Sequence, residues 1–135
     1  MITAVDTSVL IDVFGADARF GSTSANALRL GLNEGAVVAC SIVWSETRAA
    51  FPSDEEFTQA MSTIGVGFSA MAEQAATLAG VTWKKYRAAG GKRERVIADF
   101  LIGAHATTQC DRLLTRDRGY FKKYFAGIAL VDASA

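Results

Sequence analysis

Two aspartates follow predicted buried strands, at positions where carboxylates can meet. Asp6 comes directly after the apolar run Ile2–Val5, and Asp117 lies two residues beyond the apolar segment 112–115. Both runs are continuous rather than alternating, which is typical of strands buried in a parallel sheet. Because such sheets place their sites just beyond the carboxyl ends of the strands, we expect both carboxylates at the same edge.

Two further acids lie on predicted helices that can reach the same edge. Glu46 lies on the helix after a second predicted strand at 36–40, and Asp99 lies in the first turn of an apolar helix at 96–110. The neighbours of Asp99 are almost all apolar, and a buried carboxylate is costly unless it is paired or bound to a cation. The spacing therefore predicts one acidic cluster of four carboxylates.

Such a cluster has a natural chemistry. Converging carboxylates repel one another, which raises their pKa values, and a divalent cation relieves the repulsion. An all-oxygen ligand set favours Mg²⁺ or Mn²⁺ over zinc. Such an ion positions a water molecule, lowers the pKa of that water and neutralises charge on a phosphate under in-line attack. The natural substrate is a phosphodiester, whose hydrolysis then needs no histidine or cysteine.

Each acid taken alone also has an ordinary structural role open to it. These alternatives are a cap on the helix at 8–13 for Asp6, an ion pair with Arg48 for Glu46, an interaction with the helix dipole for Asp99 and a turn before Gly119 for Asp117. The joint placement of the four acids is more specific than the placement of any one of them.

The apolar segments predict an α/β fold in a single domain over residues 1–135. Strands that alternate with helices favour a central parallel sheet of about four to five strands, with helices on both faces. The predicted strands are 2–5, 36–40, 66–68, 112–115 and 128–131, and the predicted helices are 8–13, 22–35, 41–52, 54–64, 70–88 and 96–110. The segment after Thr115 is predicted to be a polar loop.

Four stretches of the sequence resemble the PIN-domain ribonucleases, and within them the VapC-like toxins of bacterial toxin–antitoxin pairs. The stretches are Ala4–Leu10, Ser41–Glu46, Ala98–Ala106 and Leu113–Asp117, the last followed by the aromatic and basic run Tyr120–Phe125. Each stretch contains one of the four acids. The four occur in the order and spacing of the family, across nearly the whole chain.

The resemblance implies a single PIN-like domain and a metal-dependent endoribonuclease that hydrolyses RNA phosphodiester bonds. It implies a catalytic site that binds Mg²⁺ or Mn²⁺. The acids of this site are Asp6, Glu46, Asp99 and Asp117, and Ser8 and Thr115 help to hold it. It also implies a homodimer, and a cognate antitoxin that blocks the acidic cluster with a basic side chain. The alternative is a non-catalytic RNA- or protein-binding α/β domain, which would show no metal dependence.

The net charge is zero, but basic residues are concentrated in the second half of the chain. Residues 1–83 carry 3 Lys or Arg and 9 Asp or Glu, whereas residues 84–135 carry 11 Lys or Arg and 5 Asp or Glu. Contact with a polyanion and two solvated faces of opposite charge explain this asymmetry equally well. Near the acids, the candidate RNA-binding residues are Lys92, Arg93, Arg95, Arg116 and Arg118. The alternatives for them are solvated charge and ion pairs that orient the acids.

Sulfur and imidazole chemistry is not expected. The two cysteines, Cys40 and Cys110, and the single histidine, His105, do not form a zinc site of the usual spacing. We expect both cysteines to be free and His105 to be structural. No apolar run is long enough to span a bilayer and no signal peptide is evident, so a cytoplasmic protein without membrane contact is expected.

A few other positions receive provisional roles. We expect Asp12 to be a surface acid, and Trp44 and Trp83 to be core or interface residues more often than base-stacking ones. The apolar residues within 9–14 are candidates for a dimer or antitoxin surface. A phosphatase of the haloacid type is disfavoured, because that chemistry needs a second aspartate where this chain has Ser8.

Overall fold

The computed structural model describes residues 1–92 and 95–134 of the chain, and within them it contains five strands and seven helices. The strands are β1 (Ile2–Val5), β2 (Ala36–Cys40), β3 (Val66–Ser69), β4 (Arg112–Thr115) and β5 (Leu130–Asp132). The helices are α1 (Thr7–Phe14), α2 (Gly21–Glu34), α3 (Ser41–Arg48), α4 (Asp54–Ile64), α5 (Glu73–Ala88), α6 (Ile97–Gln109) and α7 (Arg118–Tyr124).

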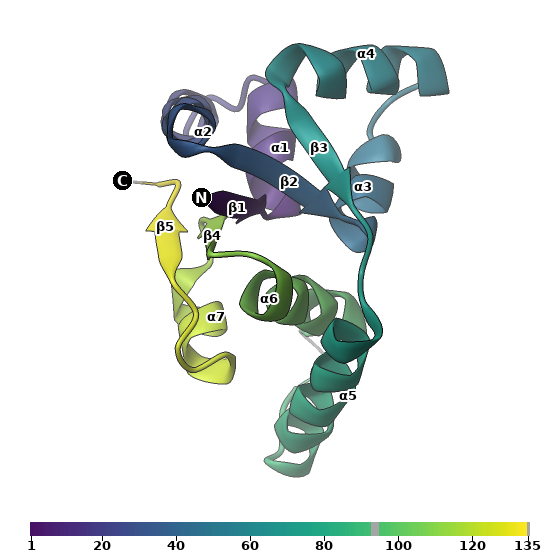
Figure 1. The fold of residues 1–135 in the computed structure, drawn as a ribbon, viewed down its shortest axis with the longest axis vertical. Coiled ribbons are helices and arrows are strands. Elements are labelled where there is room, and N and C mark those ends of the chain that lie inside the picture. The colour runs from purple at the N-terminus through teal and green to yellow at the C-terminus, as the bar shows by residue number, and fades with distance from the viewer. Residues whose placement is uncertain (93–94, 135) are drawn as a thin grey trace.

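The strands form one parallel sheet in the order β3-β2-β1-β4-β5. The central strand β1 pairs with β2 and β4, and its Ala4 lies opposite Val38 on one side and Leu113 on the other. Helices α1 and α2 lie on one side of the sheet, and α5, α6 and α7 lie on the other (Figure 1). The α/β fold with a parallel sheet covered on both faces is therefore confirmed.

Local signals in the sequence set the ends of several helices. Ser53 caps α4, because its Oγ accepts a hydrogen bond from the Glu56 N–H at 3.2 Å. The same helix ends at Gly65, whose φ of 77° lies in the left-handed region that glycine favours. Asp6 caps α1 directly after β1, since its Oδ1 accepts from the Thr7 N–H at 2.8 Å. The chain thus turns from strand to helix at an acidic residue.

The prediction of a polar loop after Thr115 is wrong, because residues Arg118–Tyr124 form α7. Tyr120 and Phe121 are buried on this helix. The Tyr120 ring meets the buried Phe100 of α6 edge to face, with 5.5 Å between the ring centroids. Packing of these aromatic rings outweighs the two lysines and the glycine that make the segment look like a loop.

Helix α1 was expected to offer apolar residues to a dimer or antitoxin surface, but two of them are buried inside the protein. Val9 and Leu10 are 0% exposed and pack in the core, so they are not available to a partner, whereas Ile11 is 38% exposed.

Trp44 packs edge to face on Phe57 at a centroid distance of 5.2 Å, in keeping with a core role. No helix within the described ranges has the length and apolar character that crossing a membrane requires.

The cysteines and the histidine take structural places. Cys40 and Cys110 are both free, as predicted. His105 is buried on α6, and its Nε2 lies 2.9 Å from the Ser69 Oγ of β3, at hydrogen-bond distance. Burial lowers the pKa of His105, so the neutral ring is favoured. His105 therefore ties α6 to the sheet in a neutral form.

Candidate active site

A cavity of about 500 Å³ opens at the carboxyl edge of the sheet, and the four predicted acids line it together. They come from four separate elements: the end of β1, helix α3, the first turn of α6 and the residue before α7. These acids are Asp6, Glu46, Asp99 and Asp117. The predicted convergence at one edge of the sheet is therefore present in the structure.

Asp6 is the most constrained of the four acids. Its Oδ2 accepts a hydrogen bond from the Thr115 Oγ at 2.8 Å and a longer one from the Ser8 Oγ at 3.5 Å, while its Oδ1 accepts from the Thr7 N–H. Burial raises the pKa of Asp6, and the negative charges of Asp117 and Asp99 add to that rise, although the hydrogen bonds oppose it. Negative charge at this point is costly, which is the condition that a cation relieves.

Thr115 links two of the acids through one hydroxyl group. This fully buried side chain donates to Asp6 and accepts from the Asp117 N–H at 2.9 Å. The end of β4 is thereby fixed against the end of β1. Of the two residues expected to support the site, Thr115 makes the closer contact and Ser8 the weaker one.

The other acids also have local partners. Glu46 is exposed and its Oε1 accepts from the Thr7 Oγ at 2.7 Å, whereas Arg48 pairs with Asp54 instead of with Glu46. Asp99 caps its own helix, since its Oδ2 accepts from the Val96 N–H at 3.1 Å. The cap predicted as the alternative for Asp6 is thus present, and Asp99, for which a dipole interaction was the alternative, caps the start of its helix. These caps also hold both side chains at the cavity, so the two interpretations are compatible.

Three of the candidate RNA-binding arginines form ion pairs. Arg95 contacts Asp117 at 2.7 Å and Arg118 contacts Asp132 at 3.3 Å. Arg116 pairs with Asp12 and also lines the acidic cavity. The ion-pair alternative therefore applies to Arg95, which orients a cavity acid.

The two other candidates give less information. Lys92 is exposed. Arg93, which was predicted to bind RNA, lies outside the described residues.

The expectation that Asp12 is a surface acid is wrong, because this residue is only 4% exposed. Its carboxylate accepts hydrogen bonds from the Arg116 Nε at 2.6 Å, from the Arg116 Nη2 at 3.1 Å and from the Ser24 Oγ at 2.9 Å. Helical spacing places position 12 on the same face as Val9, which is fully buried. That spacing was the signal for burial, and a buried carboxylate requires a cationic partner.

The composition of the cavity fits a hard divalent cation, because carboxylate oxygens are the ligands that Mg²⁺ and Mn²⁺ prefer. Among the residues that the structure describes, no three acids lie close enough together to hold an ion as they stand. Asp117 is engaged by Arg95 and Glu46 by the Thr7 hydroxyl. Both side chains are therefore held by partners other than Asp6 in this structure.

Several solved structures share this fold. The fold is similar to that of VapBC-1 from nontypeable Haemophilus influenzae, with a TM-score of 0.76, 18% identity and 100% of each chain covered. VapBC2 from Rickettsia felis bound to a DNA fragment from their promoter gives a TM-score of 0.76 at 17% identity, with 98% of each chain covered. A toxin–antitoxin complex from Klebsiella pneumoniae gives 0.67 at 19% identity, with 97% of each chain covered.

The sequence identities to these structures are low, so the structural matches show a similarity of fold alone. Among the curated proteins, none matches the chain. The sequence does match the model of one protein family, described as the PIN domain, over residues 3–126. That match spans almost the whole chain and includes all four acids of the cavity, and so the chain belongs to the PIN domain family.

Proposed function

We propose that this protein is a VapC-like toxin, an endoribonuclease that depends on Mg²⁺ or Mn²⁺ and is inhibited by a cognate antitoxin. One observation carries the proposal: four carboxylates from four elements line a single cavity at the carboxyl edge of the sheet in a PIN domain. The pKa of Asp6 supports it: burial raises that pKa and the charges of Asp117 and Asp99 add to the rise, so negative charge there is costly and a bound cation would relieve it.

The four acids would hold the metal: Asp6, Glu46, Asp99 and Asp117. When bound, the ion would supply a water of lowered pKa and neutralise charge on the phosphate. Thr115 keeps the Asp6 carboxylate turned to the cavity through its hydroxyl hydrogen bond. Arg116 stands at the rim on its buried partner Asp12, where its positive charge attracts an approaching phosphate.

Arg95 has a separate role in the free protein. Its ion pair with Asp117 offsets part of the repulsion among the acids. An RNA phosphate at the rim competes for this guanidinium, and Asp117 is then released toward the other acids. The arginine thus contributes both to the resting cavity and to substrate attraction.

The partner assignment rests on the similar structures, which include complexes of a toxin with an antitoxin. An antitoxin that covers this cavity needs a basic side chain to meet the four acids. We further propose a homodimer, following the family resemblance, and an intracellular site of action on RNA.

The proposed activity predicts a strict metal requirement. Purified protein incubated with total cellular RNA and Mn²⁺ should yield discrete cleavage products, mapped by primer extension. A chelator should reduce the rate more than about 100-fold, because the four acids would then lack the ion that would activate the water and compensate charge on the phosphate. Excess Mn²⁺ added afterwards should restore the same products.

Two results would count against the proposal. Cleavage that persists in the chelator would exclude the metal-dependent mechanism. RNA binding that is equal with and without metal, with no cleavage of any cellular RNA, would favour the non-catalytic alternative.

A further inference from the structure

A second cavity, of about 740 Å³, adjoins the acidic one. It lies between the last turns of α5 and the start of α6, and the residues important here are Trp83, Arg87, Lys92, Arg95, Val96 and Ile97. Arg95 lines both cavities. A ligand in the second cavity would therefore lie immediately beside the acids.

Two residues that line the second cavity contact acids of the first cavity directly. Arg95 contacts Asp117 at 2.7 Å, and the Val96 N–H donates to Asp99 at 3.1 Å. The Arg95 side chain and the Val96 backbone, both from residues that line the second cavity, thus contact two of the four acids. This arrangement holds the second cavity in register with the acidic one.

The lining of this cavity combines aromatic, apolar and basic groups. Of its described lining residues, three are basic and none is acidic. The Arg87 guanidinium lies 5.2 Å from the centre of the half-buried Trp83 ring, within the range of a cation–π contact. Val96 and Ile97 add apolar surface that is 56% and 37% exposed. Aromatic and guanidinium planes stack bases, and cations bind the adjoining phosphates.

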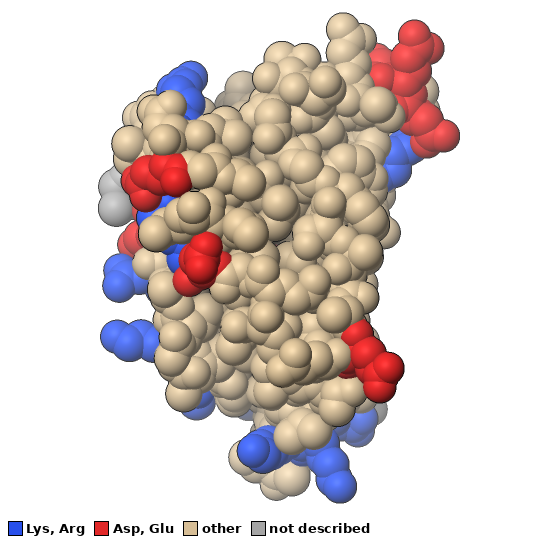
Figure 2. Space-filling view, viewed as in Figure 1, with Lys and Arg blue, Asp and Glu red and all other residues tan. Residues whose placement is uncertain are grey.

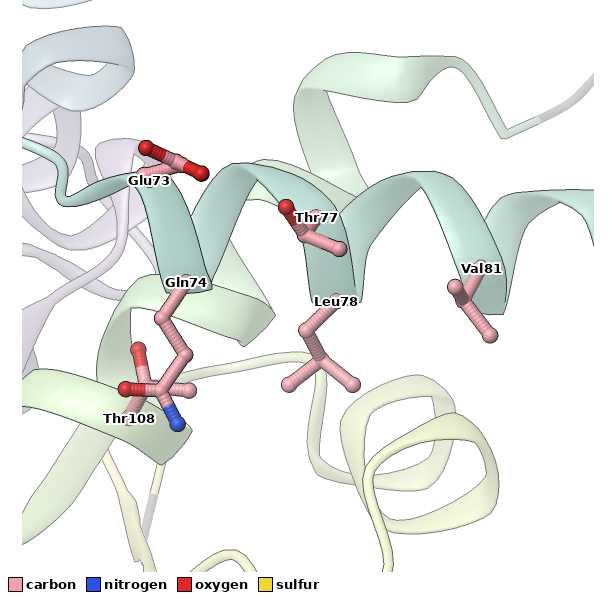
Figure 3. Close-up of a pocket in the computed structure, with 6 residues that line it drawn as sticks. All are labelled: Glu73, Gln74, Thr77, Leu78, Val81 and Thr108. Carbon is pink, nitrogen blue, oxygen red and sulfur yellow. The ribbon is translucent and has the colours of Figure 1, made fainter.

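The other end of α5 offers a contrast. Along its first turns, a cavity of about 640 Å³ is lined by Glu73, Thr77, Leu78 and Val81, and by no basic residue among those described (Figure 3). Basic side chains gather at the bottom of the molecule, over the C-terminal end of α5, and along its left edge, whereas acidic ones gather over α4 at the top (Figure 2). Of the two ends of α5, the C-terminal one, next to the acidic site, therefore suits a polyanion better.

We propose that this second cavity is a nucleotide-binding subsite, which takes an unpaired base of the RNA beside the scissile phosphate. The proposal rests on the proposed ribonuclease function. Trp83 and Arg87 form the stacking platform, and Lys92 and Arg95 bind the flanking phosphates. A base inside a duplex is already stacked, so the subsite selects single-stranded or looped RNA.

RNA binding without cleavage tests this directly. A fluorescein-labelled single-stranded RNA is titrated with the full-length protein in a chelator, and anisotropy reports the Kd. Trp83→Leu should weaken binding about 5- to 150-fold, because one stacked base contributes that much. Trp83→Phe should retain most of the affinity. The matched control Arg29→Gln, an exposed position on α2, should change the Kd less than about twofold.

Tryptophan fluorescence gives a second readout that does not depend on affinity. In a Trp44→Phe background Trp83 is the remaining tryptophan, and single-stranded RNA should quench its emission while an RNA duplex should not. Absence of quenching, or equal quenching by both RNAs, would overturn the subsite. So would equal Kd values for the Trp83→Leu variant and the wild type.

The outcomes separate the subsite from the ribonuclease activity. Metal-dependent cleavage with the same KM in Trp83→Leu as in the wild type would overturn the subsite and leave the activity standing. Loss of RNA affinity in Trp83→Leu, with no metal-dependent cleavage by the wild type, would support the subsite and overturn the activity.

Discussion

Replacement of Asp6 or of Asp99 by asparagine should abolish RNA cleavage and leave the fold intact. Each change removes a negative charge from the acidic cavity. Loss of a residue that merely orients a ligand costs about 10- to 100-fold, so loss of a direct ligand should lower the single-turnover rate by more than about 100-fold. Asparagine retains a carbonyl oxygen that can accept from the Thr7 or Val96 N–H, so the helix caps should survive.

A graded series makes this result specific. Thr115→Val removes the hydroxyl that holds Asp6, and should lower the rate by an intermediate factor of about 10 to 100. Glu55→Gln removes a carboxylate from exposed α4 and should leave the rate unchanged. Circular dichroism and thermal unfolding of every variant check the fold. Wild-type rates in both aspartate variants would refute the assignment of the cavity as the active site.

Asp12→Ala should be the most destabilising change among the charged residues. It leaves the partly buried Arg116 without its bidentate partner and removes the acceptor of the Ser24 hydroxyl. Breaking a buried ion pair costs about 3–5 kcal/mol, and partial exposure of Arg116 lowers the expected loss in the free energy of unfolding to about 2–4 kcal/mol. Urea denaturation measures this loss, provided that the m-value of the variant equals that of the wild type.

The exposed ion pair Arg48–Asp54 provides the matched control. Asp54→Ala should cost less than about 1 kcal/mol, because the Asp54 side chain is 93% exposed. Asp12→Leu combined with Arg116→Leu should recover part of the loss of Asp12→Ala, since no unpaired charge remains. If Asp12→Ala proved as mild as Asp54→Ala, the buried pair would not be a structural anchor.

The strands, and the placement of Asp6 and Asp117 beyond their carboxyl ends, could be predicted because they depend on local sequence. Ile2–Val5 and Ala36–Cys40 are apolar runs whose burial on both faces leaves few alternatives to a central parallel strand. Once these strands are parallel, a residue that directly follows one, such as Asp6, must lie at the carboxyl edge. The strand order was not predictable, since nothing local specifies that β4 pairs with β1.

The errors arose where contacts distant in sequence decide the structure. Helix α7 has no side-chain cap at its N-terminus, and it forms because Tyr120 and Phe121 pack against the core. Aspartate is usually a surface residue. Burial of Asp12 is tolerable because its charge is paired with that of Arg116, which lies far from it in the sequence. The pairing of Arg95 with Asp117 contradicts no prediction, but it could not be foreseen, because it depends on how α6 and α7 are brought together.

The most direct test of the central claim is calorimetric titration of Mn²⁺ into the protein without RNA. The wild type and Glu55→Gln should show the same saturable heat of binding, because both retain the four carboxylates of the cavity. Asp6→Asn should lose that heat while remaining folded. Equal Mn²⁺ binding by the wild type and Asp6→Asn, or no binding by the wild type, would contradict a metal site at this cavity.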